Sequence, residues 1–182
     1  MKKTIYTVLI AVFTTVYVSA QEIKWVTLEQ AIELQKKEPK KIMMDVYTSW
    51  CGPCKMLDKN TFHNEDVVKY VNEHYYAVKF NAEGNEEVNY KGEVFSNPNY
   101  NPALANRRNS AHELSRYFQV QAYPTIVFMD ETGELIAPIT GYQQPQGLEL
   151  YLKMFKTDAH KNIKTQEDFN TYYNAFKAEF KS

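Results

Sequence analysis

The only two cysteines of the 182-residue chain, Cys51 and Cys54, lie three residues apart, just beyond a compact apolar run at 42–47. A disulfide across so short a loop adds little stability, because the stabilisation grows with the length of the closed loop. The pair is therefore predicted to be reactive rather than structural. The apolar run is predicted to be a buried strand that leads into it.

The cysteines are predicted to open a helix. Pro53 suits the first helical turn, where its missing N–H costs little. Cys51 would then lie at the helix N-terminus, where unpaired backbone N–H groups and the helix dipole favour a thiolate. Cys54 would follow one turn later, close enough to form a ring. This order predicts that Cys51 attacks and that Cys54 resolves the mixed disulfide.

Two charged residues interrupt apolar runs near the cysteines. Asp45 lies in the middle of the 42–47 run, six residues before Cys51. Because a lone buried carboxylate is costly, Asp45 is interpreted as a proton-exchange partner of Cys54; a strand-edge aspartate in water is the alternative. Lys79 lies in a second apolar run, 75–80, and is either a partner of Asp45 or a surface lysine.

Pro124 follows Tyr123 at the start of a predicted strand, 125–129. Proline is awkward there because it cannot donate a ladder hydrogen bond. A cis Tyr123–Pro124 peptide bond would suit a tight turn at this point, and an ordinary trans loop proline is the alternative.

Residue patterns predict alternating helices and strands. The expected strands are 42–47, 75–80, 125–129 and 135–140, the last two joined by a turn at 130–133. The expected helices are 28–37, 65–73, 110–118, 148–155 and a last one over about 165–181. Capping boxes mark three of these helices: Thr27 with Gln30, Ser110 with Glu113, and Thr165 with Asp168. Asn64 is predicted to cap the helix at 65–73. The alternation predicts an α/β layered fold with a late β-hairpin.

The last helix is predicted to carry aromatic residues on one face, namely Phe169, Tyr172, Tyr173, Phe176 and Phe180.

Residues 82–110 break this alternation, since they are rich in Asn, Gly, Pro and Glu. An irregular stretch of this length is uncommon inside a compact domain and is often functional. The stretch is therefore either a contributor to partner choice or a harmless surface loop.

The first twenty residues differ from the rest. They begin with Met1-Lys2-Lys3, continue with a mostly apolar run at 4–18, and end with small residues at 18–20. This layout is typical of a secretory signal peptide. The run is short beside the about 20 residues of a transmembrane helix, so an uncleaved anchor is the alternative. The sequence thus predicts an exported, periplasmic protein with one domain at 21–182.

These residues together resemble the thioredoxin family. Residues 50–55 (Trp-Cys-Gly-Pro-Cys-Lys) match its active-site sequence, and residues 123–125 resemble its cis-proline loop. The spacing from Asp45 to Cys51 matches thioredoxin's buried aspartate. Residues 78–81 resemble the thioredoxin strand that carries a lysine beside this aspartate. Gly141 occupies the position at which the family has a glycine on its substrate-binding face. The sequence is also similar to the C-terminal domain of DsbD-type transmembrane disulfide reductases, at 57–64 and 124–133.

The resemblance covers about residues 25–155. It implies a thioredoxin-like fold, a central mixed sheet flanked by helices, with 82–110 inserted and the C-terminal helix added. The implied active-site groups are the cysteine pair with its Cys51–Cys54 disulfide, Asp45 and Lys79. The implied substrate-binding residues are Trp50, Gly52, Pro53, Tyr123, Pro124 and Gly141.

The implied activity is thiol–disulfide exchange on protein disulfides, without a cofactor. Gly52-Pro53 between the cysteines implies the reducing end of the family. A reductase in an oxidising compartment needs electrons from across the membrane, which implies a transmembrane thiol reductant as its donor. A disulfide oxidase or isomerase and a non-catalytic binding module with the same fold are the alternatives.

Charge and ligand patterns argue against other classes of function. The formal net charge is −1 and Lys and Arg are scattered, which is unlike a nucleic-acid-binding surface. Zinc would need more ligands than one cysteine pair, and the four histidines show no ligand spacing with it. The sequence therefore predicts no metal site and no nucleic-acid partner.

Overall fold

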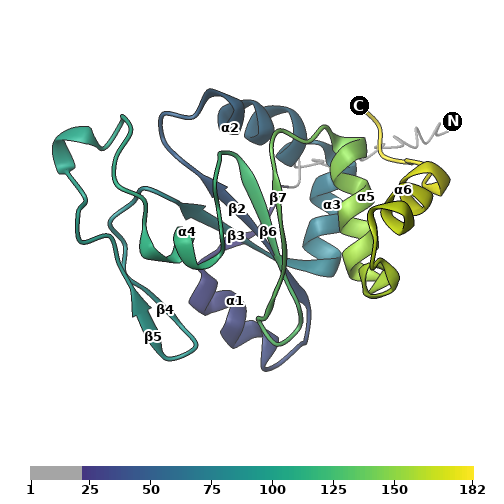
Figure 1. Cartoon of the computed structure of the whole chain (residues 1–182), viewed down its shortest axis with the longest axis horizontal. Coiled ribbons are helices and arrows are strands. Elements are labelled where there is room, and N and C mark those ends of the chain that lie inside the picture. The colour runs from purple at the N-terminus through teal and green to yellow at the C-terminus, as the bar shows by residue number, and fades with distance from the viewer. Residues whose placement is uncertain (1–21) are drawn as a thin grey trace, which may run out of the picture.

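A five-stranded mixed sheet forms the centre of the computed structural model, which describes residues 22–182 (Figure 1). The predicted signal peptide, residues 1–20, lies outside the described residues. The strand order is β1-β3-β2-β6-β7, in which β1, β3 and β2 run parallel and β6 and β7 are antiparallel to their neighbours. The strands are β1 (Trp25–Val26), β2 (Lys41–Tyr47), β3 (Tyr75–Asn81), β6 (Thr125–Met129) and β7 (Leu135–Thr140). This is the mixed sheet expected from the sequence.

Strand β2 lies in the middle of the sheet and is almost wholly buried. Successive side chains of a strand point to opposite faces. Ile42, Met44 and Val46 therefore pack on one face, in a core separate from that of Met43. Asp45 shares the Met43 side by the same alternation, which places a carboxylate inside one layer of the molecule.

Helices cover both faces of the sheet. On the Met43 side lie α2 (Gly52–Leu57), a π-helical turn η1 (Asp58–Phe62), α3 (Glu65–His74) and α5 (Pro145–Lys156). On the other side lie α1 (Leu28–Gln35) and α4 (Glu113–Tyr117). No helix within residues 22–182 is both long and apolar enough to cross a membrane.

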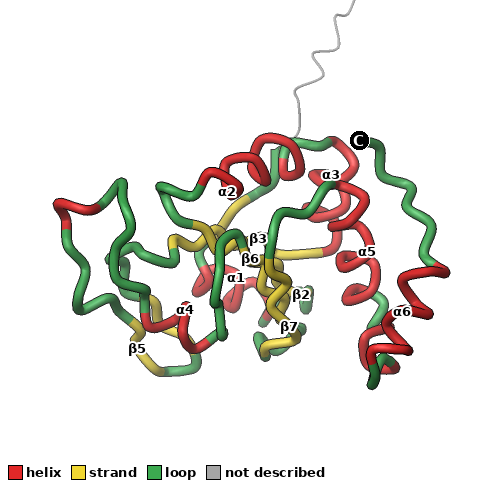
Figure 2. Tube along the Cα trace, turned by 45° about the horizontal axis from the view of Figure 1, so that its top comes forward, coloured by secondary structure: helices red, strands yellow, loops and turns green. Residues whose placement is uncertain are grey.

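The 82–110 insertion has structure of its own, which the sequence did not predict. It contains an antiparallel hairpin of β4 (Val88–Tyr90) and β5 (Glu93–Phe95), and a 3₁₀ turn η2 (Pro102–Leu104). Lys91 and Gly92 turn the hairpin with φ values of 55° and 81°, the left-handed backbone that tight hairpin turns require. Figure 2 shows that loops join these short elements on one side of the molecule.

Aromatic packing holds this hairpin on the domain. The ring of Tyr90 lies 5.6 Å from that of Tyr117 and 5.4 Å from that of Phe118. Its hydroxyl donates to the Gly133 carbonyl oxygen at 2.5 Å. The insertion therefore extends the second core instead of hanging free in solvent.

The helix predicted over 110–118 starts later, at Glu113. His112, not Ser110, is its N-cap: the ring Nδ1 accepts the backbone N–H of Leu114 at 3.1 Å. The Ser110 hydroxyl donates to Asn97 Oδ1 at 2.7 Å instead. The capping prediction was wrong because the insertion supplies a tertiary acceptor that the local pattern cannot show.

The last helix, α6 (Gln166–Ala175), starts with the predicted capping box of Thr165 and Asp168. It ends six residues earlier than the predicted end at about 181, so the single aromatic face through Phe176 and Phe180 was wrong. A short 3₁₀ turn, η3 (Ala159–Asn162), precedes it.

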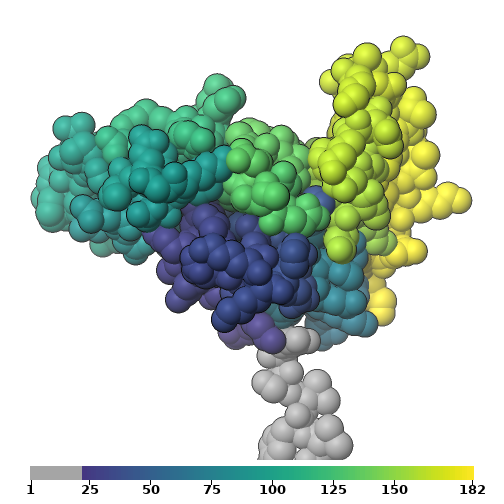
Figure 3. Space-filling model, turned by 90° about the horizontal axis from the view of Figure 1, so that it is seen from below, coloured from purple at the N-terminus to yellow at the C-terminus, as the bar shows by residue number. Residues whose placement is uncertain are grey.

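The insertion and the C-terminal part project on opposite sides of the molecule (Figure 3).

Two carboxylates, one on α5 and one on α3, accept hydrogen bonds from the backbone of the chain beyond α6. The backbone N–H groups of Glu179 and Phe180 donate to the Glu149 carboxylate, which is fully buried, at 2.8–3.0 Å. The N–H of Lys181 donates to Asp66 Oδ2 at 2.8 Å. These acceptors on α5 and α3 hold residues 176–182 in an extended course along the domain.

A buried lysine links the far end of β2 to the rest of the domain. Lys41 is 1% exposed, and its ammonium pairs with Glu131 at 2.5 Å and Asp158 at 2.9 Å. Lys41→Met keeps the chain length but removes the charge, so it should lower the free energy of unfolding by about 1–3 kcal/mol. Urea unfolding measures this. Lys36→Met, in an exposed pair with Glu33, is the control and should change nothing measurable; equal midpoints for both variants would contradict the prediction.

Candidate active site

The cysteine pair lies where β2 gives way to α2. Cys51 is the N-cap of α2, and its Sγ accepts the backbone N–H of Cys54 at 3.1 Å. The two cysteines form a disulfide with a Cα–Cα distance of 5.3 Å, and they are only 3% and 6% exposed. Pro53 lies in the first turn, where its missing N–H leaves no helical hydrogen bond unmade. Cys51 therefore faces unpaired N–H groups that would favour its thiolate.

Asp45 lies on the Cys54 side of the pair. Asp45, Thr48 and Cys54 line one cleft of about 330 Å³ together with Lys79 and Asp58. The carboxylate is 2% exposed, and its Oδ1 has no hydrogen-bond partner within the described chain. Burial raises the pKa of Asp45 to about 7; the positive charge of Lys79 opposes this rise and Asp58 adds to it. The group can thus take up or release a proton near neutral pH.

Lys79 is the neighbour of Asp45 in the register of β2 and β3, but it forms its ion pair with Asp58. Its ammonium also lies over the rings of Trp25 at 5.2 Å and Tyr47 at 5.5 Å. Of the two interpretations of Lys79, the structure shows no ion pair with Asp45, although the positive charge of Lys79 acts on the Asp45 carboxylate. Asp45 points into the buried layer, whereas the long lysine side chain reaches the half-exposed rim, where Asp58 meets it.

Asp58 is a residue of this cleft that the sequence analysis missed. It opens the π-helical turn η1, and such turns are frequent at functional sites. It also follows Cys54 by four residues, a spacing that places both side chains on one helix face. That spacing is the sequence pattern that could have identified it.

A second cleft, of about 550 Å³, opens on the Cys51 side. It brings together four of the predicted substrate-binding residues, Trp50, Gly52, Pro53 and Tyr123. Its other lining residues besides Cys51 are Glu83, Arg108, Gln121 and Ala122.

The two remaining predicted substrate-binding residues, Pro124 and Gly141, do not line this cleft. The Tyr123–Pro124 peptide bond is cis, and Pro124 is buried. The N–H of Gly141 donates to the Pro124 carbonyl oxygen at 2.8 Å, with the glycine at φ +99°. Gly141 therefore supports the proline loop from the end of β7.

The insertion forms one wall of the second cleft. The indole N–H of Trp50 donates to Glu83 Oε2 at 2.7 Å, and the same oxygen accepts the backbone N–H of Asn109 at 2.8 Å. The guanidinium of Arg108 lies 4.9 Å from the centre of the Trp50 ring. Glu83 and Arg108 were missed because they are distant in sequence, and no short motif connects them to Trp50.

No three His, Cys, Asp or Glu side chains within residues 22–182 come together in a geometry that could hold a metal ion. The chemistry available here is that of the two sulfurs and the carboxylate beside them. A mixed sheet flanked by helices, with a Cys-x-x-Cys disulfide at the start of a helix, defines a thioredoxin-like thiol–disulfide oxidoreductase. The chain belongs to the thioredoxin-like domain family, whose sequence pattern matches residues 28–156.

Known proteins with similar sequences carry the name thiol:disulfide interchange protein DsbD. The relative from Actinobacillus pleuropneumoniae is 27% identical over 121 residues, which is 63% of this chain and 17% of the relative. The relative from Vibrio vulnificus (strain CMCP6) is 31% identical over 121 residues, 64% of this chain and 16% of the relative. The chain thus spans about a sixth of the length of the curated relatives it matches.

A solved structure of a thioredoxin-fold protein from Helicobacter pylori is similar in fold. It has a TM-score of 0.56 and 22% identity, and the match covers 75% of this chain and 81% of that one. At this identity the likeness concerns the fold alone.

Proposed function

We propose that this protein is an exported disulfide reductase that transfers electrons from the Cys51–Cys54 dithiol to protein disulfides. The observation that carries the proposal is the position of the disulfide between two clefts, with Cys51 lining one and Cys54 lining the other beside Asp45. The Cys51 cleft can receive a partner's disulfide, and the Cys54 cleft contains Asp45 as a proton acceptor. The names of the DsbD relatives support disulfide exchange.

Exchange begins on the Cys51 side. In the reduced protein, the Cys51 thiolate attacks one sulfur of the partner's disulfide. A bond forms between Cys51 and that sulfur, the partner's S–S bond breaks, and the other partner sulfur leaves as a thiolate that takes a proton from water. The N–H groups at the start of α2 stabilise the attacking thiolate.

Resolution takes place on the Cys54 side. The Asp45 carboxylate accepts the proton of the Cys54 thiol, which its pKa of about 7 permits. The Cys54 thiolate then attacks the sulfur of Cys51, the bond to the partner breaks, and the partner leaves as a second thiolate. Two electrons pass to the partner, and the Cys51–Cys54 disulfide forms.

The reducing direction rests on Gly52-Pro53, the dipeptide of thioredoxin, and on resemblance to DsbD-type reductases. We further propose that residues 1–20 export the chain to the periplasm, where a transmembrane thiol reductant returns it to the dithiol. Disulfide oxidation and isomerisation are the alternative directions for the same chemistry.

A redox titration of the Cys51–Cys54 couple tests the direction. Thioredoxin, the reference for the reducing end, lies near −270 mV and the oxidant DsbA near −120 mV, a span worth about 7 kcal/mol for two electrons. We expect a value close to that of thioredoxin, measured in glutathione or dithiothreitol buffers. A potential above about −180 mV, or a largely oxidised protein in cells that contain the donor, would contradict the reductase assignment.

A further inference from the structure

We propose that Arg108 makes this protein select partner segments that carry an acidic residue next to the reacting cysteine. The inference rests on the proposed function, because it concerns which disulfides reach Cys51. It assigns the 82–110 insertion a role in specificity through one side chain.

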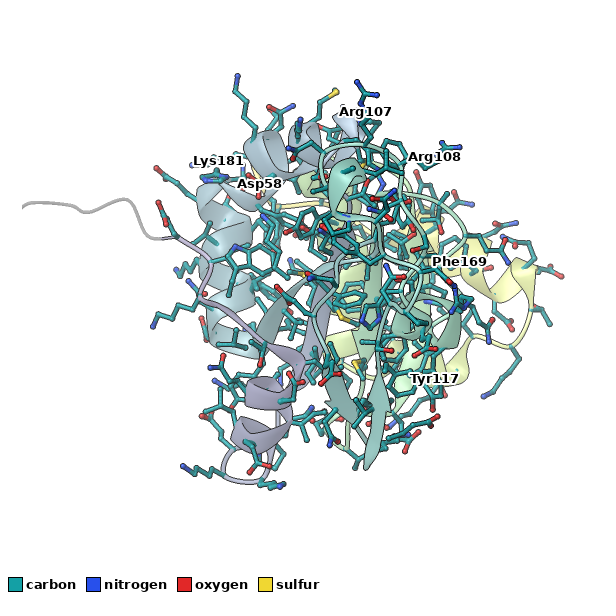
Figure 4. The ribbon with its side chains drawn as sticks, turned by 90° about the vertical axis from the view of Figure 1, so that its left-hand side faces the viewer. Asp58, Arg107, Arg108, Tyr117, Phe169 and Lys181 are labelled. Carbon is teal, nitrogen blue, oxygen red and sulfur yellow. A yellow bond between two sulfur atoms is a disulfide. The ribbon has the colours of Figure 1, made fainter. Side chains whose placement is uncertain are left out.

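Arg108 is held in place at the mouth of the Cys51 cleft. Its guanidinium lies over the ring of Trp50, the residue directly before Cys51. Trp50, Cys51 and Arg108 all line this cleft. Stacking on an aromatic face fixes the plane of a guanidinium and leaves its edges able to donate. Figure 4 shows Arg107 and Arg108 near each other, on the side of the molecule that the insertion forms.

Apart from its stacking on Trp50, the guanidinium of Arg108 has no polar partner among residues 22–182. None of the salt bridges among residues 22–182 includes it. Glu83, which also lines the cleft, is 8% exposed, and its Oε2 accepts hydrogen bonds from Trp50 and Asn109. Glu83 therefore acts as a positioning residue for the wall of the cleft, while the guanidinium stays available to a ligand.

The remaining surface of the cleft is uncharged. Gly52, Pro53, Gln121 and Ala122 line it and are exposed, so Arg108 is the exposed charge that an arriving segment meets. A carboxylate can accept two parallel hydrogen bonds from a guanidinium, whereas a lysine would meet a like charge. The cleft therefore favours a partner segment with Glu or Asp beside its cysteine.

The test uses three capped peptides that differ only in the residue before their cysteine, which is Glu, Gln or Lys. Each cysteine carries a thiopyridyl group, an uncharged leaving group. In Cys54→Ser protein, the Cys51 thiolate attacks the peptide sulfur; the new S–S bond forms, the bond to the thiopyridyl sulfur breaks, and thiopyridone is released and measured. We expect the Glu peptide to react about 3- to 10-fold faster than the Lys peptide at low salt, and the ratio to shrink at high salt.

Charge reversal separates selection by Arg108 from a merely structural effect. In the Cys54→Ser background, Arg108→Glu should invert the order of the peptides, and Arg107→Ala, a neighbouring arginine outside the cleft lining, should keep it. The ratio of two peptide rates cancels any common change in the reactivity of Cys51.

An uncharged small disulfide, bis(2-hydroxyethyl) disulfide, distinguishes the two possible failures. If reduced wild-type protein reduces it but the peptide ratio is the same with Arg108 and with Arg108→Glu, the inference about Arg108 is overturned and the proposed function stands. If wild-type protein reduces no disulfide at all, the proposed function is overturned together with the inference that rests on it.

Discussion

Replacement of Cys51 by serine is expected to abolish thiol–disulfide exchange, with a loss of at least about 10³-fold that is limited by the assay background. Removal of a covalent nucleophile can cost on the order of 10⁶ in other enzymes. The physical reason is that Cys51 lines the partner cleft and faces the N–H groups that favour a thiolate, whereas Cys54 lies on the Asp45 side. Reduction of insulin or of a small disulfide measures the loss.

The matched variant, Cys54→Ser, should leave the first attack intact and accumulate mixed disulfides through Cys51. Mass spectrometry of trapped complexes identifies the bonded cysteine. Met56→Ala, on the same helix and 52% exposed, serves as the control and should exchange at the wild-type rate. The roles would be reversed if the Cys51→Ser variant trapped partners on Cys54 and the Cys54→Ser variant trapped none on Cys51.

Asp45→Asn is expected to slow resolution of the mixed disulfide by about 10- to 100-fold at pH 8, since general-base catalysis typically contributes 10²–10⁴-fold. Asp45 accepts a proton only when ionised, and its pKa is about 7. The ratio of wild-type to variant rates should therefore rise as pH increases through about 7. Stopped-flow measurements across pH 6–9 test this, and pH-independent equality of the two rates would remove Asp45 from the mechanism.

The same substitution should stabilise the protein at alkaline pH. The folded-state pKa of Asp45 is about 7, above its ordinary value of 3.8, so the native state binds the proton more tightly than the unfolded state. Wild-type stability should thus decrease as pH rises from about 4 to 7 and then level off. The asparagine variant should lack this decrease and gain at most about 4 kcal/mol at pH 8, three pKa units at 1.36 kcal/mol each.

Urea unfolding at pH 4 and pH 8 measures this difference. Asp58→Asn, at the half-exposed rim of the same cleft, is the matched control. It retains Asp45, so its stability should still decrease between pH 4 and pH 8 as that of the wild type does. A stability difference that is the same at both pH values would mean that Asp45 is not the titrating group.

Local sequence patterns predicted the elements that carry the cysteines. Strand β2, the start of α2 and the capping box of Thr27 and Gln30 all occur as predicted, because each depends on residues a few positions apart. Strand β1, only two residues long, was missed. It has too few residues to show an alternating pattern, and it forms because β3 provides a parallel partner.

The rest of the site depends on contacts between distant residues. Glu83 binds Trp50 across 33 positions, and Lys79 binds Asp58 across 21. The path of the C-terminal tail depends on Glu149, about 30 residues earlier. Periodicity and capping describe neighbouring residues only. The sequence therefore indicated Asp45 and Lys79 as active-site residues without showing that Lys79 would form its ion pair with Asp58.

Each sulfur of the disulfide belongs to a different cleft, Cys51 to one and Cys54 to the other, which separates the site of partner binding from the site of proton transfer in the proposed mechanism. In the proposed mechanism a partner bound in the Cys51 cleft would cover Trp50 and Cys51, whereas Lys55 and Asp58 line the other cleft, which would remain open to bulk water. Protons can therefore enter and leave while the partner is still attached. A large client and a small one would then be released at similar speeds, because the bulk of the client does not obstruct the ionisation that frees it.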